Sequence, residues 1–187
     1  MTHGRWGALA AALAIPLAGC SFTGDESAST LHPPASAPAD LCQSGQAYAH
    51  ANLGYHACYP NGWQQRDYTA EPGANGALSV VAFGPPSTVP AHVAQGTEFA
   101  VPLEVRVIAG AKDGLERSLI SGNQVDHVTV AGSTADRIRV TQDGPALGAV
   151  IVVFEHLGDT FELEKAPGGG YEPEFESFLA SFGFSPS

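Results

Sequence analysis

The segment 53–63 (LGYHACYPNGW) constrains the fold more than any other part of the sequence. Tyr55 and Tyr59 lie on one face of a period-two pattern, which is typical of a strand with one buried side. Pro60 cannot donate a ladder hydrogen bond, so we expect the strand to end there. The Asn-Gly pair that follows favours a tight turn, and Trp63 is too large to be left wholly in water. The segment therefore predicts a half-buried strand, a sharp turn and an aromatic anchor.

Hydrophobic periodicity predicts further strands and two helices. The strands are expected at 77–83, 101–109, 125–130, 134–141, 148–156 and 161–165. The helices are expected at 112–120 and 171–182, the second with an apolar stripe of Tyr171, Phe175, Phe178, Leu179 and Phe182. Strands joined by short turns, with few helices between them, indicate a mostly antiparallel sheet. The predicted fold class is α+β, with the sheet between helices as an α/β/α sandwich.

Three finer expectations concern the arrangement of these segments. Residues 63–68 are expected to return along the first strand as a hairpin. The most apolar strand, 148–156, is expected at the centre of the sheet. Glu104, Glu162 and Glu164 alternate with apolar residues, so we expect them on solvated strand faces. The segment 41–52 has no clear pattern and is left open.

The first 19 residues have the features of a secretory signal. Arg5 precedes an almost wholly apolar run that is shorter than the ~20 residues of a permanent membrane-spanning helix. Residues 17–20 (LAGC) resemble the lipobox of bacterial lipoproteins, in which the cysteine is acylated and becomes the first residue of the mature chain. The resemblance implies that Cys20 carries a lipid anchor with acyl chains such as palmitate. It also implies an extracytoplasmic protein attached to a bacterial membrane.

The segment 20–40 is rich in Ser, Ala, Thr and Pro and is almost without large apolar residues. Such a segment cannot bury enough surface to offset its ordering entropy, so we interpret it as a flexible tether. The remaining residues, 41–187, are then a single globular domain. The predicted organisation is a signal peptide, a lipidated tether and one domain.

The charge of the chain limits its partners. There are 8 basic and 19 acidic residues, and only one of these, Arg5, would leave with the signal. A strongly acidic domain is repelled by phosphate backbones, which argues against nucleic acid as a partner. It is also repelled by anionic lipid, so attachment to the membrane is expected through the acyl groups alone.

The three cysteines fall into two groups, which are Cys20 alone and the pair Cys42 and Cys58. With Cys20 acylated, Cys42 and Cys58 remain in a compartment where disulfides persist, and we predict that they are bridged. A zinc-binding pair or two free thiols are the alternatives.

The first strand also carries a family resemblance. The pattern Tyr55-x-x-x-Tyr59-Pro60-x-Gly62-Trp63, with an aromatic-rich terminal helix, resembles PsbP-like domains, whose fold is shared with Mog1. This resemblance implies an antiparallel sheet between helices, and a family of mostly binding or assembly proteins whose bacterial members are often secreted or lipid-anchored. Plant PsbP tunes the ion requirement of photosystem II and Mog1 binds the GTPase Ran, but neither set of binding residues can be placed here. A disulfide at Cys58 departs from the usual family pattern.

The sequence contains none of the common catalytic motifs, such as Gly-x-Ser-x-Gly, a Walker loop or His-Glu-x-x-His. The histidines have no metal-ligand spacing, although His50 could approach His56, and His127 could lie on a strand next to that of His156. Four acidic residues could instead supply a carboxylate pair or a calcium site, or could be solvated strand ends: Asp126, Asp136, Glu155 and Asp159.

The function that these observations favour is non-catalytic. We expect a lipid-anchored binding or assembly accessory protein of the cell envelope, with an unknown protein partner and with neither a cofactor nor a metal. The first alternative is a carrier of a small ligand or lipid, whose apolar pocket would be lined by Trp63, Tyr55, Tyr59, Phe154 and Phe161. A hydrolase without a recognised motif ranks last.

Overall fold

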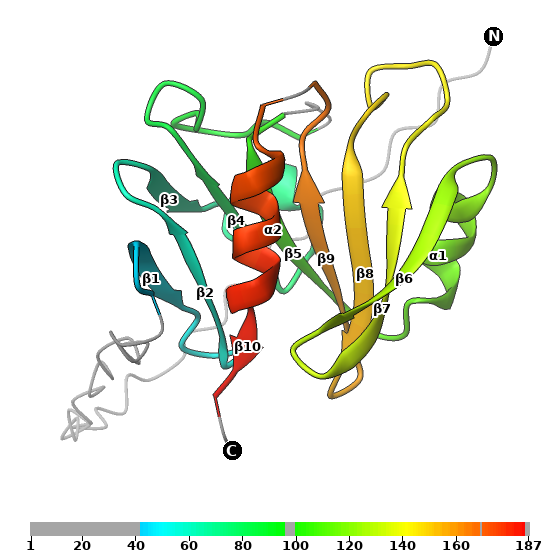
Figure 1. Cartoon of the computed structure of the whole chain (residues 1–187), viewed down its shortest axis with the longest axis horizontal. Helices are drawn as coiled ribbons and strands as arrows, with labels where there is room; N and C mark the ends of the chain where they lie inside the picture. The colour runs from blue at the N-terminus through cyan, green and yellow to red at the C-terminus, as the bar shows by residue number, and fades with distance from the viewer. Residues whose placement is uncertain (1–41, 96–99, 169, 186–187) are drawn as a thin grey trace, which may run out of the picture. The chain divides into compact units, whose positions relative to one another are not determined.

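The structure is a computed structural model that describes residues 42–95, 100–168 and 170–185. These residues form two sheets with helices on both sides of the larger one (Figure 1). The small sheet has the order β1-β2-β10 and the large sheet has the order β3-β4-β5-β9-β8-β7-β6, with antiparallel pairing throughout. The α+β fold with mostly antiparallel strands is therefore as the sequence predicted. The signal, Cys20 and the tether lie outside the described residues, and those predictions stay predictions.

The elements follow the predicted order closely. The small sheet comprises β1 (Gly45–Ala49), β2 (Tyr55–Pro60) and β10 (Gly183–Phe184). The large sheet comprises β3 (Gln64–Asp67), β4 (Ser79–Gly84), β5 (Leu103–Ala109), β6 (Gln124–Val130), β7 (Ser133–Arg139), β8 (Val150–His156) and β9 (Asp159–Lys165). The helical elements are η2 (Pro72–Ala74), α1 (Asp113–Ile120) and α2 (Glu172–Ser181). In the described part of the chain, none of the helices has the length and apolar character needed to cross a membrane.

The predicted hairpin between the first strand and residues 63–68 is wrong. The turn itself forms, with Gly62 at a φ of 82° and the Trp63 N–H donating to the Pro60 carbonyl at 3.2 Å. However, β3 pairs with β4 of the large sheet. Both edges of β2 are occupied, one by β1 and the other by β10, which is made of residues more than a hundred positions further along the chain. The turn thus passes the chain from one sheet to the other.

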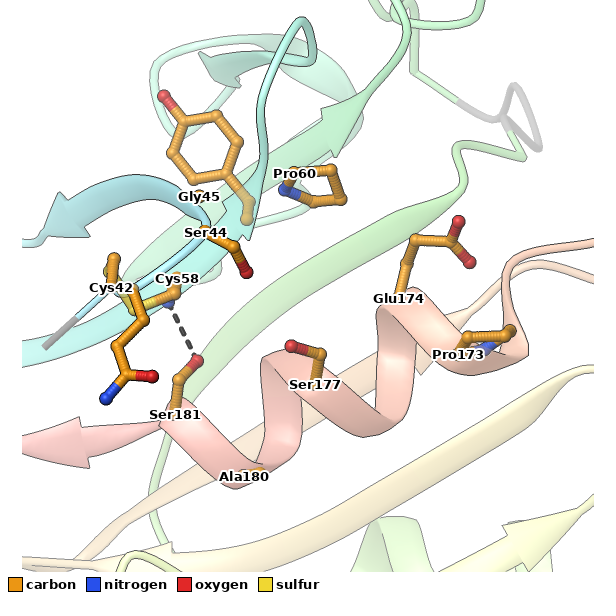
Figure 2. A pocket seen from close by; sticks show the side chains of 12 residues that line it. Cys42, Ser44, Gly45, Cys58, Pro60, Pro173, Glu174, Ser177, Ala180 and Ser181 are labelled. Carbon is orange, nitrogen blue, oxygen red and sulfur yellow. Dashed lines mark hydrogen bonds between the residues drawn. A yellow bond between two sulfur atoms is a disulfide. The ribbon is translucent and has the colours of Figure 1, made fainter.

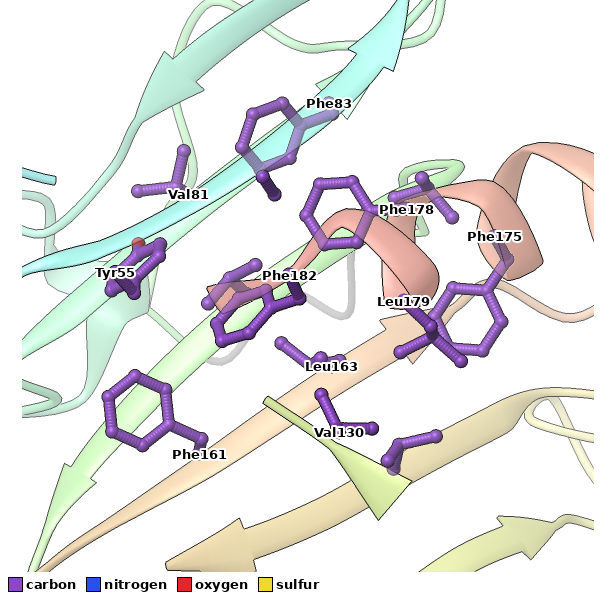
Figure 3. Close-up of a cluster of buried hydrophobic side chains, with 14 of the residues drawn as sticks. Tyr55, Val81, Phe83, Val130, Phe161, Leu163, Phe175, Phe178, Leu179 and Phe182 are labelled. Atoms are coloured by element: carbon purple, nitrogen blue, oxygen red, sulfur yellow. The ribbon is translucent and has the colours of Figure 1, made fainter. Parts of the chain in front are cut away.

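The apolar face of the large sheet forms the main core. The strand that the sequence placed at the centre, β8, is almost wholly buried but lies beside the middle strand, β9. Helix α2 and the small sheet cover this face (Figure 1). Phe175, Phe178 and Leu179 of the predicted stripe are buried, and Phe182 after the helix is 4% exposed. Figure 3 shows these side chains beside those of Phe83 of β4 and Leu163 of β9.

The opposite face of the large sheet is divided into two small apolar clusters. The segment around η2 packs Tyr68 and Val93 against Val80 and Ala82 of β4. At the other end of the sheet, Leu119 of α1 packs on a cluster that includes Ile138 of β7. Between these clusters, β5 and β9 carry charged side chains. The two faces of one sheet therefore differ: the first carries the main apolar core, and the second has a charged strip between two small apolar clusters.

We predict that Phe178→Ala lowers the free energy of unfolding by about 3–5 kcal/mol, because it leaves a cavity in the main core. Phe178 is 1% exposed and its ring centroid lies 5.2 Å from that of Phe83. Chemical denaturation of the two proteins measures the difference. Ser177→Ala, an exposed neighbour on the same helix, serves as the control and should change stability by about 0.5 kcal/mol or less. Equal stabilities for Phe178→Ala and the unmodified protein would contradict the assigned core.

Candidate binding groove

A groove of about 520 Å³ lies between α2 and the end of the small sheet (Figure 2). Its sheet side is lined by Cys42, Gln43, Ser44, Gly45, Cys58, Tyr59 and Pro60. Its helix side is lined by Pro173, Glu174, Ser177, Ala180 and Ser181. The volume is within the usual range of about 300–1,000 Å³ for ligand sites. The lining combines apolar surface with hydroxyl groups and one carboxylate.

The sheet side is held in place by the predicted disulfide pair and by close backbone contacts. Cys42, just before β1, is joined to Cys58 of β2, and their Cα atoms are 5.6 Å apart. The backbones approach closely at Gly45, where an added Cβ would lie 2.6 Å from the Tyr59 carbonyl oxygen. A side chain cannot be accommodated there without moving the backbone. The segment 41–52, which the sequence left open, thus contains an edge strand that is covalently fixed at its start.

The family-like residues of the first strand connect this wall to the rest of the domain. Tyr55 is fully buried, its hydroxyl lies 3.2 Å from the Ser79 hydroxyl of β4, and its ring stacks on Phe182 at 5.4 Å. Burial raises the pKa of Tyr55 well above its ordinary value. Tyr59 is 8% exposed, so it both packs in the core and lines the groove. Trp63 is only partly buried and meets Tyr171 edge-on at 5.4 Å.

The helix side is joined to β2 by a side-chain bridge. The Cys58 N–H donates to the Ser181 hydroxyl at 2.8 Å, and that hydroxyl donates to the Phe178 carbonyl at 2.9 Å. β10 pairs with β2 only at His56 and Tyr55, so the last turn of α2 takes the place of a strand beyond that point. Pro60 has no N–H to offer. From Cys58 to Pro60, the edge of β2 that faces α2 therefore presents no free backbone donor.

The other side of α2 is bound to the large sheet by ion pairs. Glu176 accepts from Arg137 at 2.8 Å. Glu172 lies 3.4 Å from both Arg139 and the buried Lys165. Charges on the two surfaces thus orient the helix, and they direct Glu172 and Glu176 away from the groove.

Glu174 differs from these two glutamates because it lines the groove. One of its carboxylate oxygens is buried and has no hydrogen-bond partner among the described residues. In Figure 2 its side chain rises from α2 toward the Pro60 side of the groove. Among the described residues that line the groove, Glu174 is the one with a charge, and that charge is negative.

The polar residues that the sequence singled out lie elsewhere. Asp136 is 4% exposed and accepts from Lys112 Nζ at 2.5 Å and from His127 at 2.6 Å. Glu155 accepts from the Lys112 backbone N–H at 2.7 Å. These contacts make Asp136 a structural link between α1, β6 and β7. Over the described ranges, no three His, Cys, Asp or Glu side chains are placed to hold a metal ion.

The predicted approach of His127 and His156 is wrong, because β7 lies between their strands. The ring of His156 stacks on Phe184 of β10 with centroids 3.4 Å apart. A second hollow, of about 360 Å³, lies beside His50 at the end of β1. His50 is engaged there, because its Nδ1 accepts from the Leu53 N–H at 3.2 Å and its ring stacks on Tyr55.

The aromatic residues proposed as the walls of an apolar pocket instead pack on one another. Phe154 and Phe161 stack at 5.4 Å, and Phe161 meets Tyr55 edge-on at 5.8 Å. All three are 2% exposed or less. Figure 3 shows Tyr55 and Phe161 within the same filled cluster. Three of the five residues suggested for a lipid carrier, Tyr55, Phe154 and Phe161, are thus core residues, whereas Tyr59 lines the groove and Trp63 is partly buried.

The charged strip on the second face consists of Glu104 and Arg106 of β5 with Glu162 and Glu164 of β9. The sequence periodicity predicted the exposure of its glutamates wrongly. Glu104 is 8% exposed and Glu164 is half-buried, although both were expected in solvent. The two residues are direct cross-strand neighbours, and Arg106 binds Glu104 at 3.0 Å. Burial, with Glu104 and Glu162 nearby, raises the pKa of Glu164 to about 7. Burial likewise raises the pKa of Glu162 to about 7, against the opposing effect of Arg106.

The described residues thus define an α+β domain of antiparallel strands with a groove beside its last helix. Solved structures that are similar to it include the solution structure of cyanobacterial PsbP (CyanoP) from Synechocystis, with a TM-score of 0.45 and 17% identity over 76% of this chain and 93% of that one. They also include a protein from Bacteroides thetaiotaomicron, with a TM-score of 0.48 and 14% identity over 77% of this chain and 50% of that one. No family model matches the sequence, and no curated protein is significantly similar to it. At these identities the likeness concerns the fold alone and says nothing about activity or partners.

We predict that Glu164→Gln stabilises the protein at about pH 8. The folded-state pKa of Glu164, about 7, lies above its ordinary value of 4.5, so the carboxyl favours folding when protonated. That contribution is complete below about pH 4.5 and is lost as the pH rises through about 7. The free energy of unfolding of the variant should therefore be higher by on the order of 1–2 kcal/mol at about pH 8, and it should depend less on pH.

Denaturation curves at several pH values test this. The control is Asp143→Asn, which removes an exposed carboxyl from the loop between β7 and β8. This variant should leave the slope of stability against pH unchanged. A Glu164→Gln profile parallel to that of the unmodified protein would show that this carboxyl does not titrate near neutral pH.

Proposed function

We propose that this chain is a lipid-anchored, extracytoplasmic binding protein that acts without catalysis and takes its ligand in the groove beside α2. The observation that carries the proposal is the groove itself, whose one charged side chain has a buried oxygen without a partner. Buried polar atoms in proteins are nearly always hydrogen-bonded, and an exception requires an explanation. A ligand that binds in the groove and turns the half-buried Glu174 carboxylate toward itself, so that this oxygen gains a donor, is such an explanation.

The proposed compartment is supported by the cysteines. A cysteine pair at disulfide distance, Cys42 and Cys58, is compatible with an oxidising environment outside the cytoplasm. The remaining cysteine, Cys20, follows the signal-like segment at the lipobox position. The disulfide also fixes the wall of the groove next to the tether, so an external compartment and a preformed site would go together.

A binding role is supported by the chemistry of the lining. A serine nucleophile needs an adjacent base, most often a histidine that is itself oriented by a third group. The lining contains serine hydroxyls and one carboxylate, its two cysteines are joined to each other, and Ser181 is engaged with β2 and with its own helix. These groups are suited to recognition through hydrogen bonds and charge.

The anchor is tested by metabolic labelling with radioactive palmitate. We expect Cys20→Ala to remain as an unprocessed precursor without label, because the thioether link requires the thiol. Ser21→Ala, a change at the next residue, should be processed and labelled as usual. Palmitate incorporation into the Cys20→Ala protein would refute the lipid anchor.

The groove is tested by placing a photo-reactive residue at Gln43 or at Ser177, which are exposed and line opposite sides. In native membranes, both positions should give the same cross-linked adduct, and a photo-reactive residue at Asp143 should give none. Ala180→Trp, which fills the groove from an exposed position, should abolish both adducts. Adducts that persist with Ala180→Trp, or that form equally from Asp143, would show that the ligand contacts the protein elsewhere.

A further inference from the structure

The groove has a chemical preference, and this inference rests on the proposed function of the groove as a ligand site. We propose that it binds a primary ammonium or guanidinium group, which forms a charge-assisted hydrogen bond with the Glu174 carboxylate. The sources of such a group are a free amine or the Lys or Arg side chain of a protein partner.

The first argument is the charge of the lining. Helix α2 carries three glutamates in its first five residues, and two of them have cationic partners on the large sheet. The third, Glu174, lines the groove, and one of its carboxylate oxygens is buried and has no partner within the described part of the chain. A glutamate in the first turn also interacts favourably with the helix dipole, by about 0.3–1 kcal/mol. That interaction explains an acidic residue near the helix start, but it supplies no hydrogen-bond donor to the buried oxygen.

The second argument is the hydrogen-bonding character of the lining around Glu174, which is rich in acceptors. The backbone N–H of Cys58 is used by Ser181, and Pro60 and Pro173 have no N–H. The polar side chains of Gln43, Ser44, Tyr59 and Ser177 can all accept hydrogen bonds as well as donate them. A ligand that fits this lining brings donors and needs acceptors. Ammonium and guanidinium groups are donor-only, which is the complement of this lining.

The third argument is the remaining surface. Pro60, Pro173 and Ala180 supply apolar walls, against which the methylene stem of an amine can pack while its charged end reaches the carboxylate. The net charge of −11 for the whole chain attracts cations at long range. Anionic ligands are disfavoured both by Glu174 and by this overall charge.

The test is a titration of the mature, lipidated protein in detergent, followed by amide chemical shifts of Ser177 and Ala180. The probes are n-butylamine, which is cationic at neutral pH, and 1-butanol as the uncharged probe of similar size. We expect saturable shifts with n-butylamine and none with 1-butanol. Glu174→Gln, which keeps the shape of the side chain, should weaken n-butylamine binding by about tenfold or more. Asp126→Asn removes the same charge from an exposed position on β6 and should have no effect.

The source of the group is distinguished with the N-acetylated, C-amidated peptides Gly-Gly-Lys-Gly-Gly and Gly-Gly-Gln-Gly-Gly, in which the Lys side chain is the one primary ammonium. Binding of the Lys peptide at least about tenfold tighter than n-butylamine, with loss in the Gln peptide, supports a protein side chain as the source. Equal binding of the Lys peptide and n-butylamine supports a free amine.

Two results would overturn the inference: equal n-butylamine affinity for Glu174→Gln and the unmodified protein, or equal shifts with 1-butanol. Either result can occur while the cross-links from Gln43 and Ser177 still form and are lost when Ala180→Trp is added. In that case the groove remains a ligand site with a different preference. If the cross-links are absent as well, the proposed function fails with it. A melting temperature of Glu174→Gln equal to that of the unmodified protein establishes that a loss of binding does not reflect unfolding.

Discussion

The packing of α2 on the apolar face of the large sheet is the interaction on which the rest of the domain depends. Three of its buried side chains, Phe175, Phe178 and Leu179, complete the main core. Its last turn holds the edge of β2 through Ser181, and Phe182 after it stacks on Tyr55. The small sheet is attached to the large one through this helix and also directly, since Tyr55 contacts both Ser79 of β4 and Phe161 of β9. The same helix supplies one wall of the groove, so the groove depends on the packing that forms the core.

The two faces of the large sheet show how differently one set of strands can be used. On the first face, every strand from β4 to β8 contributes apolar side chains to a single cluster. On the second, two small clusters leave a strip where three glutamates share one nearby arginine, Arg106. Burial of these carboxyls favours their neutral form, which couples the stability of the fold to pH. The groove lies on the first side, beyond the core, and is separate from this strip.

Individual residues show where sequence reasoning succeeded and where it could not. The alternation at Tyr55, Ala57 and Tyr59 predicted the buried face of β2 correctly, because the side-chain period of a strand is local. The Asn-Gly turn was also correct, yet the strand after it joined β4, since pairing depends on which edges the distant β1 and β10 occupy. Glu104 was expected in solvent because alternation marks the two faces of a strand but not what covers each of them. Glu174 was not recognised, since only its placement opposite Pro60 distinguishes it from Glu172 and Glu176.

The sequence by itself determined the α+β class, most elements and their order, the stripe of α2, and the pairing of Cys42 with Cys58 as an expectation. All of these follow from local periodicity, turn chemistry and residue counts. The tertiary structure alone decided the division into two sheets, the burial of the glutamate strip and the groove with its unpaired carboxylate. These features arise where segments far apart in the chain meet. Their contacts are chosen by the packing of the whole domain, which no single stretch of sequence encodes.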